Sequence, residues 1–261
     1  MAVVASITAV VVYRRVPADP ESGPVPSVRA EIASLRDGRI WLVLAGCAIV
    51  CGSSLAAYSF ISPLLTQNTG LAASAIPLVL VGYGLGAFLG TNVGGRLGAN
   101  RPYAVLFVSA TATFLVLAAL CLFSHHPVVT VGLVMLLGLF GMSTNPVLIG
   151  MAVRYADRAP TLASALSTAS FNAGTAVGSW IAGFAIESSL GATGPVLVGV
   201  CIAALYFVPL AILFSKERAA RREPAVVERG LAEATARVAS DEGADESHFS
   251  RVDQLGGAGL R

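Results

Sequence analysis

Two asparagines stand in the middle of long apolar stretches, where an unpaired amide is unfavourable. Asn145 lies in "GMSTNPVLIG" and Asn172 lies in "STASFNAGTAVG". An amide transferred to hydrocarbon loses several kcal/mol unless it is hydrogen-bonded, so both side chains are expected to face protein or water. Each can either join two helices by hydrogen bonding or line a polar cavity, and the sequence leaves these two roles open. Pro146 and the glycines around it are expected to break the helix locally.

Aromatic side chains near the end of one apolar stretch offer a second kind of contact. Tyr58 and Phe60 follow one another closely in "AAYSFIS". They can form an aromatic wall of a cavity or anchor a helix at the membrane interface, and both readings remain open. Asn92 lies closer to the end of its stretch and is expected to cap or bridge helices.

Enzyme chemistry inside the apolar stretches is not supported by the residue types present. An intramembrane serine protease needs a serine and a histidine that meet within the bilayer. The serines of "CGSS" and "GMST" have no such partner, because the histidines are His125, His126 and His248, outside the apolar stretches. Metal-dependent membrane enzymes fail in the same way, and the four cysteines fit neither a disulfide framework nor a zinc site. We therefore expect no enzyme activity, no metal and no cofactor.

The composition is that of a membrane protein. Of 261 residues, 55% are hydrophobic and only 12% are charged, with a mean hydropathy of +0.75, whereas soluble domains carry about 25% charged residues. A helix needs about 20 apolar residues to cross a bilayer core of about 30 Å. Six stretches meet this length, so we predict an all-α membrane protein with a six-helix transmembrane bundle. The predicted spans are 40–60, 76–97, 103–123, 128–151, 162–186 and 194–214.

The arginines predict which loops face the cytoplasm. Arg96 and Arg101 separate spans two and three, and Arg154 and Arg158 separate spans four and five. The alternate loops contain no Lys or Arg, which is the pattern of positive loops held inside. We therefore expect a multi-pass cell-membrane protein with both termini in the cytoplasm. A net charge of +2 with scattered basic residues argues against a nucleic-acid partner.

The remaining segments are expected to be cytoplasmic or incomplete. Residues 1–15 offer only a short apolar run before two arginines and resemble the last half of a transmembrane helix. Residues 16–38 are rich in proline and charge and predict a cytoplasmic linker. Residues 39–215 form the predicted six-helix domain, and residues 216–261 predict a disordered cytoplasmic tail.

Small residues recur every four positions in the second and fifth spans. The second span carries Gly82, Gly86, Gly90, Gly94 and Gly98. Such a ridge lets another helix approach closely in lipid. The fifth span repeats the spacing with Ser170, Gly174, Gly178 and Ala182.

Spans two and five are the middle helices of two successive three-helix units. Because three is odd, the units have opposite orientations, which is the inverted 3+3 repeat of many transporters. We expect Gly86→Leu or Gly90→Leu to block assembly with a further six-helix unit.

Two stretches resemble the major facilitator superfamily. "AAYSFISPLLTQNTGLAASAIPLVLVGYGLGAFLGTNVGGRLGANRP" resembles the seventh and eighth helices of that family, and "TLASALSTASFNAGTAVGSWIAGFAIE" resembles its eleventh helix. The resemblance is to the drug-efflux branch with arabinose-efflux-like and chloramphenicol-export proteins. It implies the C-terminal half of a twelve-helix fold, with Met1 inside the sixth helix.

The turn "GGRLGANRP" is similar to the signature loop of that family, in which charge pairing braces the cytoplasmic side. Gly94, Gly95, Arg96 and Arg101 fit the pattern, while Ala99 or Asn100 stands where an aspartate is common. The resemblance therefore implies a gating loop whose latch is weakened or rests on Arg96 alone.

The function implied is proton-coupled efflux of a drug or sugar by alternating access, as an antiporter. The implied partners are the lipid bilayer, a small-molecule substrate, and an N-terminal six-helix half or a second copy. No ionisable residue lies at mid-membrane depth in the six predicted spans, so a proton-coupling residue is expected outside them. The alternative is a non-transporting membrane subunit or an inactive truncated fragment.

Overall fold

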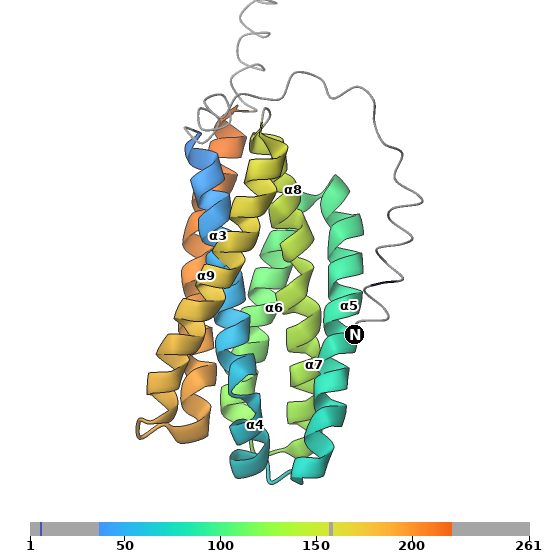
Figure 1. Ribbon diagram of the computed structural model, residues 1–261, viewed down its shortest axis with the longest axis vertical. Helices are drawn as coiled ribbons and strands as arrows, with labels where there is room; N and C mark the ends of the chain where they lie inside the picture. Colours follow the sequence, from blue (N-terminus) through green and yellow to red (C-terminus); the bar gives the residue numbers. More distant parts are fainter. Residues whose placement is uncertain (1–5, 7–36, 157–158, 221–261) are drawn as a thin grey trace, which may run out of the picture.

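The computed structural model describes residue 6 and residues 37–156 and 159–220. The predicted partial span at 1–15, most of the linker at 16–38 and the tail beyond residue 220 lie outside these residues. The described residues form helices and turns, with no strand among them. The long helices run side by side along one axis of a single bundle (Figure 1).

The helices begin and end where the sequence offers caps and breaks. Proline occupies the first turn of α5, α6, α7, α8 and α9, where its missing N–H has no intrahelical partner. The Asp37 side chain caps the first long helix by accepting the Arg39 backbone N–H at 2.9 Å. The long helices are α3 (Gly38–Ser59), α5 (Ile76–Asn100), α6 (Pro102–Phe123), α7 (Pro127–Ser143), α8 (Asn145–Tyr155) and α9 (Pro160–Ile186). The short elements are α4 (Ile61–Pro63), η1 (Leu64–Asn68), η2 (Ala73–Ala75) and η3 (Gly191–Thr193).

The last helix extends further than expected. It follows η3 and is helical from residue 194 to Ala220, whereas the sequence placed the end of the span at 214 and a disordered tail from 216. Lys, Glu, Arg and Ala are good helix formers, so the charged residues after Ser215 can continue the helix past the lipid.

Among the residues that the structure describes, five helical segments are long and apolar enough to cross a membrane. They are Gly38–Ser59, Ala73–Asn100, Pro102–Phe123, Pro127–Tyr155 and Gly191–Ala220. The expected span at 162–186 is present as α9, whose 27 residues reach about 40 Å at 1.5 Å per residue. It is not among the five because serine, threonine and Asn172 dilute its apolar residues. Since α9 packs along α3, it covers a similar stretch of the bundle axis (Figure 1).

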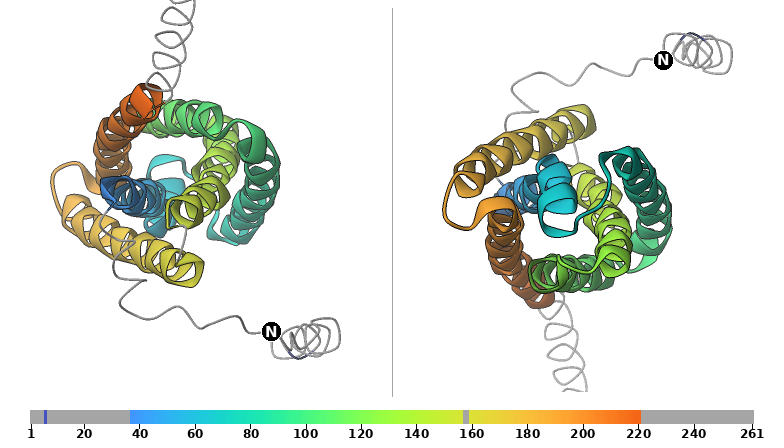
Figure 2. Two further views of the ribbon diagram at one scale, coloured as in Figure 1. Left: turned by 90° about the horizontal axis from the view of Figure 1, so that it is seen from above. Right: turned by 90° about the horizontal axis from the view of Figure 1, so that it is seen from below.

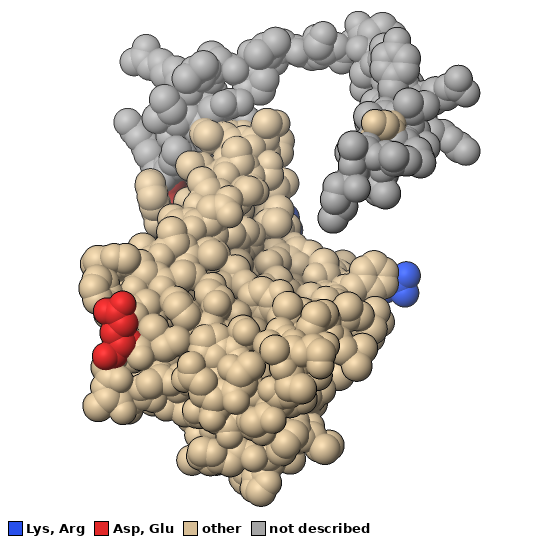
Figure 3. All heavy atoms as spheres, turned by 60° about the horizontal axis from the view of Figure 1, so that its bottom comes forward, with Lys and Arg blue, Asp and Glu red and all other residues tan. Residues whose placement is uncertain are grey.

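The outer surface is apolar to a degree that suits lipid rather than water. Large side chains such as Leu78 (74% exposed), Phe88 (66%) and Val128 (86%) point away from the bundle. The face in Figure 3 carries very few charged side chains. Patches of this extent on a protein surface mark contact with lipid or another protein.

The fourth span is broken in the middle, as its proline predicts. α7 ends at Ser143, and α8 begins at Asn145 with Pro146 in its first turn. Pro146 has no N–H to continue the ladder, and its ring crowds the preceding turn.

The bundle has an internal two-fold pattern. α5, the middle helix of the first three-helix unit, packs most extensively on α7, and α9, the middle helix of the second unit, packs on α3. Seen end-on, α5 and α9 lie on opposite sides of α3 and α7 (Figure 2). The middle helix of each unit thus packs on the first helix of the other unit, which is the arrangement expected of the inverted 3+3 repeat.

The glycines mark the two matching contacts. A methyl group at Gly86 or Gly90 would overlap the carbonyl oxygen of Met135 or Leu139, respectively, on α7. In the second unit, a methyl group at Gly174 or Gly178 would overlap the carbonyl oxygen of Ala48 or Gly52 on α3. Gly174 follows Gly86 by 88 residues and Met135 follows Ala48 by 87, so the contacts repeat along the chain.

The glycine ridge of α5 packs within this bundle, and the expected effect of Gly86→Leu or Gly90→Leu on assembly with a further unit stays a prediction. Gly82, Gly86, Gly90, Gly94 and Gly98 are all buried, and a methyl group on each would come within about 3 Å of α7 or α8. In lipid the small residues are used where two helices of one bundle approach most closely. The glycine ridge of α5 therefore packs against helices of the same chain.

Candidate functional site

Two apolar clusters fill the bundle core, with a polar layer between them. One cluster lies toward the α5–α6 turn and includes Ile40, Leu106 and Met151. The other lies toward the opposite end and includes Leu117 and Leu137. Between them, along α3, α6 and α7 and at the α7–α8 break, the buried polar residues are Ser53, Ser54, Ser109, Thr113, Ser143 and Thr144.

One side of this layer forms a group of polar side chains that we call the Asn145 cluster, made of Cys51, Ser54, Tyr58, Tyr83 and Asn145. The three residues from α3 follow spacings of three and four, which places them on one helical face. Asn145, at the start of α8, lies beside the Cys51 thiol. The Ser54 hydroxyl faces Gly141 of α7, where an added methyl group would come within 2.6 Å of it.

Tyr83 of α5 completes the cluster from the other side. Its ring stacks on that of Tyr58, with centroids 4.1 Å apart and an interplanar angle of 25°. Tyr83 is only 7% exposed. The stack joins α3 and α5 in their halves away from the α5–α6 turn. Both helices come from the same three-helix unit.

Three polar atoms of the cluster are buried without a hydrogen-bond partner among the described residues. They are Ser54 Oγ, Tyr83 Oη and Asn145 Oδ1. Asn145 Nδ2 donates to a weak acceptor, Met142 Sδ, at 3.6 Å. Each buried unpaired polar atom costs about 1–3 kcal/mol. Such a group of atoms can bind water or the polar groups of a solute.

The structure does not bring the two predicted asparagines together. Asn172 is exposed on α9, on the side away from the buried glycines Gly174 and Gly178. Within the described part of the chain it makes no hydrogen bond, unlike Asn92, which donates to the Phe88 carbonyl at 2.7 Å.

The aromatic pair is also divided. Tyr58 joins the Asn145 cluster, whereas Phe60 lies near Gly183 of α9, 3.8 Å from the position of an added methyl group. Beside it, the Ser59 and Ser179 hydroxyls are hydrogen-bonded at 3.0 Å. The predicted residues therefore do not form a single aromatic wall.

The predicted gating loop makes close backbone contacts but no ion pair within the described residues. Gly94 lies against the Ser143 carbonyl, and a methyl group on Gly95 would come within 3.6 Å of Pro146. Arg96 and Arg101 are exposed. The ion pair found among the described residues, Arg39–Glu217 at 3.9 Å, does not involve this loop. The expected alternative, a latch that rests on Arg96, has no partner in the described residues.

Sequence reasoning missed several residues that join the helices. At the loop end, Tyr103 and Tyr155 are hydrogen-bonded through their hydroxyls at 2.9 Å, and Arg39–Glu217 joins the first and last long helices. Within the cluster, Cys51, Ser54 and Tyr83 were not predicted to line a cavity. The spacing of residues 51, 54 and 58 on one face of α3 is a signal that could have identified the first two.

The comparisons with known proteins agree with this architecture. The family model described as "Major Facilitator Superfamily" matches residues 42–244. The chain is 32% identical over 170 residues to a "Chloramphenicol resistance protein" of Streptomyces lividans, which covers 65% of this chain and 43% of that protein.

Two further relatives carry the names of transporters. The chain is 28% identical over 177 residues to the "Uncharacterized MFS-type transporter YtbD" of Bacillus subtilis, covering 66% of this chain and 45% of that protein. It is 25% identical over 206 residues to the "Inner membrane transport protein YdhP" of Escherichia coli K12, covering 79% and 51%. The chain thus spans about half the length of these curated relatives. From its helical bundle and the match over most of its length, the chain belongs to the Major Facilitator Superfamily, a family of membrane transporters rather than enzymes.

Proposed function

We propose that this chain supplies one six-helix unit of a small-molecule exporter that works by alternating access. The observation that carries the proposal is the Asn145 cluster, in which three unpaired polar atoms are buried between two apolar layers. A transporter of this family binds its solute near the middle of the membrane. The break between α7 and α8 lies beside the cluster and gives the site irregular backbone of the kind that lines such paths.

A second six-helix unit completes the solute path in this proposal. It is either the N-terminal half of a longer chain or a second copy, in keeping with relatives of about twice the length. The exposed Asn172 and Thr168 of α9 then face that unit or the path rather than lipid. Both termini of the chain lie on the cytoplasmic side of the cell membrane, since the arginine-bearing loops lie there.

Proton coupling is assigned to the second unit. Between Ile40 and Phe214 the ionisable residues other than cysteine and tyrosine lie in or next to the turns between helices. Proton relays within membranes use Asp, Glu or His at depth. The Asn145 cluster can bind a solute but has no carboxylate or imidazole to carry the proton.

Chloramphenicol is the first solute to test, since the Streptomyces relative is named for resistance to it. The chain is reconstituted in proteoliposomes alone, and together with the N-terminal half of that relative, and labelled chloramphenicol uptake is measured under a pH gradient. We expect gradient-driven uptake with one of the two arrangements. Gradient-driven uptake by the chain alone would support pairing of two copies and would contradict the assignment of proton coupling to an N-terminal unit. No uptake in either case contradicts chloramphenicol export and supports a non-transporting subunit.

The Asn145 cluster is tested in whichever arrangement transports. Asn145→Ala is expected to lower uptake at least about tenfold, the effect of losing roughly 1.4 kcal/mol of solute binding. Asn92→Ala is the matched control, because the Asn92 amide is hydrogen-bonded to its own helix. Equal uptake by the two variants would remove the cluster from the solute path.

A further inference from the structure

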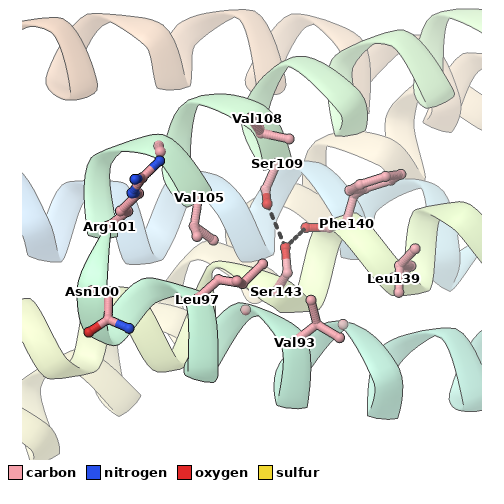
Figure 4. A pocket seen from close by; sticks show the side chains of 13 residues that line it. Val93, Leu97, Asn100, Arg101, Val105, Val108, Ser109, Leu139, Phe140 and Ser143 are labelled. Atoms are coloured by element: carbon pink, nitrogen blue, oxygen red, sulfur yellow. Dashed lines mark hydrogen bonds between the residues drawn. The ribbon is translucent and has the colours of Figure 1, made fainter.

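A groove on the outside of the bundle lies between α5 and α6 and has α7 as its floor. It has a volume of about 450 Å³. Its sides are the aliphatic residues Val93, Leu97, Val105 and Val108, and Leu139 lies at its inner end (Figure 4). The rim is open, since Val93, Leu97 and Val108 are each at least 50% exposed. The groove therefore presents an apolar channel at the surface of the bundle.

The polar groups in the floor of the groove are already paired. Ser109 and Ser143 are hydrogen-bonded through their hydroxyls at 2.6 Å, and Ser143 donates to the Phe140 carbonyl at 2.8 Å. Both serines are buried. They leave little for a polar ligand to bind along the groove, which favours an apolar occupant.

The mouth of the groove is cationic. Arg101 lies at the end nearest the α5–α6 turn, next to Asn100 (Figure 4). Its side chain pairs with no carboxylate within the described part of the chain, and neither does that of Arg96, five residues earlier, on α5. An unpaired guanidinium at the membrane surface is complementary to a phosphate group.

The length of the groove matches one leaflet. From Arg101 back to Gly90 the chain rises about 16 Å along α5, and half of a hydrocarbon core is about 15 Å. A lipid phosphate at Arg101 would thus allow an acyl chain to follow the groove to the bilayer centre.

The inverted repeat provides a natural comparison. A second groove of about 350 Å³ lies between α9 and the last helix, near the loop at the other end of the bundle. Leu197, Val198 and Cys201 line it, each 93 residues after Ala104, Val105 and Val108 of the first groove. Gly194 stands where the first groove has Arg101. The basic mouth is therefore specific to the α5–α6 groove.

We propose that the α5–α6 groove binds an anionic phospholipid, with the phosphate on Arg101 and one acyl chain along Leu97, Val105 and Val108. The inference concerns a lipid site on the outside of the bundle and does not depend on what the protein transports. Its occupant is a lipid of the leaflet on the side of the α5–α6 turn.

The test places a tryptophan in each groove and measures quenching by brominated lipids. Trp41 and Trp180 are replaced by phenylalanine, and the full chain carries either Val108→Trp or the matched control Cys201→Trp. Each variant is reconstituted in mixed vesicles of phosphatidylglycerol and phosphatidylcholine, with bromine on the acyl chains of one or the other. At position 108 we expect about a fivefold preference for phosphatidylglycerol, the effect of one basic residue near the surface. At position 201 we expect quenching without a preference for either lipid.

Two substitutions at the mouth separate charge from structure. Arg101→Lys keeps the positive charge and is expected to retain the preference at position 108. Arg101→Gln is expected to abolish it, with unchanged circular dichroism. Three results would each overturn the proposal: equal quenching by both lipids at position 108, a preference that survives Arg101→Gln, or no quenching by either lipid because protein covers the groove.

Discussion

Asn145 is the residue at which sequence and structure point most directly to a function. It lies next to the helix break at Pro146 and faces Cys51 of α3, while its carbonyl oxygen is buried without a partner. Protein interiors seldom leave a buried amide oxygen unpaired. The arrangement is unfavourable for the empty bundle, and a bound water or solute would relieve it.

This residue therefore carries a prediction of opposite signs for stability and transport. Asn145→Leu removes the buried unpaired amide and is expected to raise the free energy of unfolding by about 1 kcal/mol, while uptake is lost. Thermal unfolding in detergent measures the first effect. Thr175→Val is the control. It is not expected to raise the free energy of unfolding, since the Thr175 hydroxyl already donates to the Phe171 carbonyl at 2.9 Å. A destabilised but fully active Asn145→Leu would contradict the proposed role.

At the scale of helices, the closest contacts are those between α5 and α7 and between α3 and α9. In each pair the glycines of one helix lie against backbone carbonyls of the other. Lipid is as apolar as the helices themselves, so close van der Waals packing replaces the hydrophobic effect as the force that holds them together. Side chains of even one carbon would separate the backbones.

Two glycines of α5 give a matched pair of variants. At Gly90 a methyl group would overlap the Leu139 carbonyl, whereas at Gly84 nothing lies within 4 Å. Gly90→Ala is expected to lower the free energy of unfolding by about 1–3 kcal/mol. Gly84→Ala is expected to leave it unchanged or raise it by up to about 1 kcal/mol, from helix propensity. Denaturation in detergent compares them, and equal effects would rule out the close contact as the cause.

The inverted repeat extends this prediction to the second unit. Gly174 occupies the position in α9 that corresponds to Gly86 in α5, and a methyl group there would overlap the Ala48 carbonyl. Gly174→Ala and Gly86→Ala are expected to destabilise the bundle by similar amounts, about 1–3 kcal/mol each. Unfolding measured on both variants and on Gly132→Ala, where nothing lies within 4 Å, tests the symmetry. A harmless Gly174→Ala would show that the two contacts are not equivalent.

At the scale of the whole molecule, the number of crossings depends on α9. In the described part of the chain, five segments are apolar enough to span a membrane by themselves, and α9 is not one of them. Its glycine face packs on α3 and its exposed face carries Thr168 and Asn172. A helix of this kind can cross a membrane when protein or a water-filled path covers its polar face.

The location of the loops tests this crossing. In a chain without native cysteines, Ser188→Cys and Ala99→Cys are labelled in intact cells with a membrane-impermeant maleimide. We expect labelling at position 188 and protection at position 99, because arginine-bearing turns are expected on the cytoplasmic side and α9 is proposed to cross once more. Labelling of both positions would place both loops outside and contradict the six-crossing topology.

The sequence by itself determined the features that depend on local composition. Long uncharged stretches predict helices that cross lipid, arginines beside them predict the sides of the membrane, and Pro146 predicts the break at Thr144. The four-residue spacing of glycines identified which face of α5 is packed. Each of these features depends on residues that are close in sequence, so a single chain is enough to predict them.

The tertiary structure alone decided which residues meet. It placed α7 rather than a separate unit on the ridge of α5, stacked Tyr58 on Tyr83, and separated Asn145 in the cluster from Asn172 on the surface. In a water-soluble protein, apolar periodicity distinguishes the buried face of a helix from the exposed one. In this bundle the surroundings are as apolar as the core, so periodicity cannot make that distinction, and the partner of each helix follows only from how the whole bundle packs.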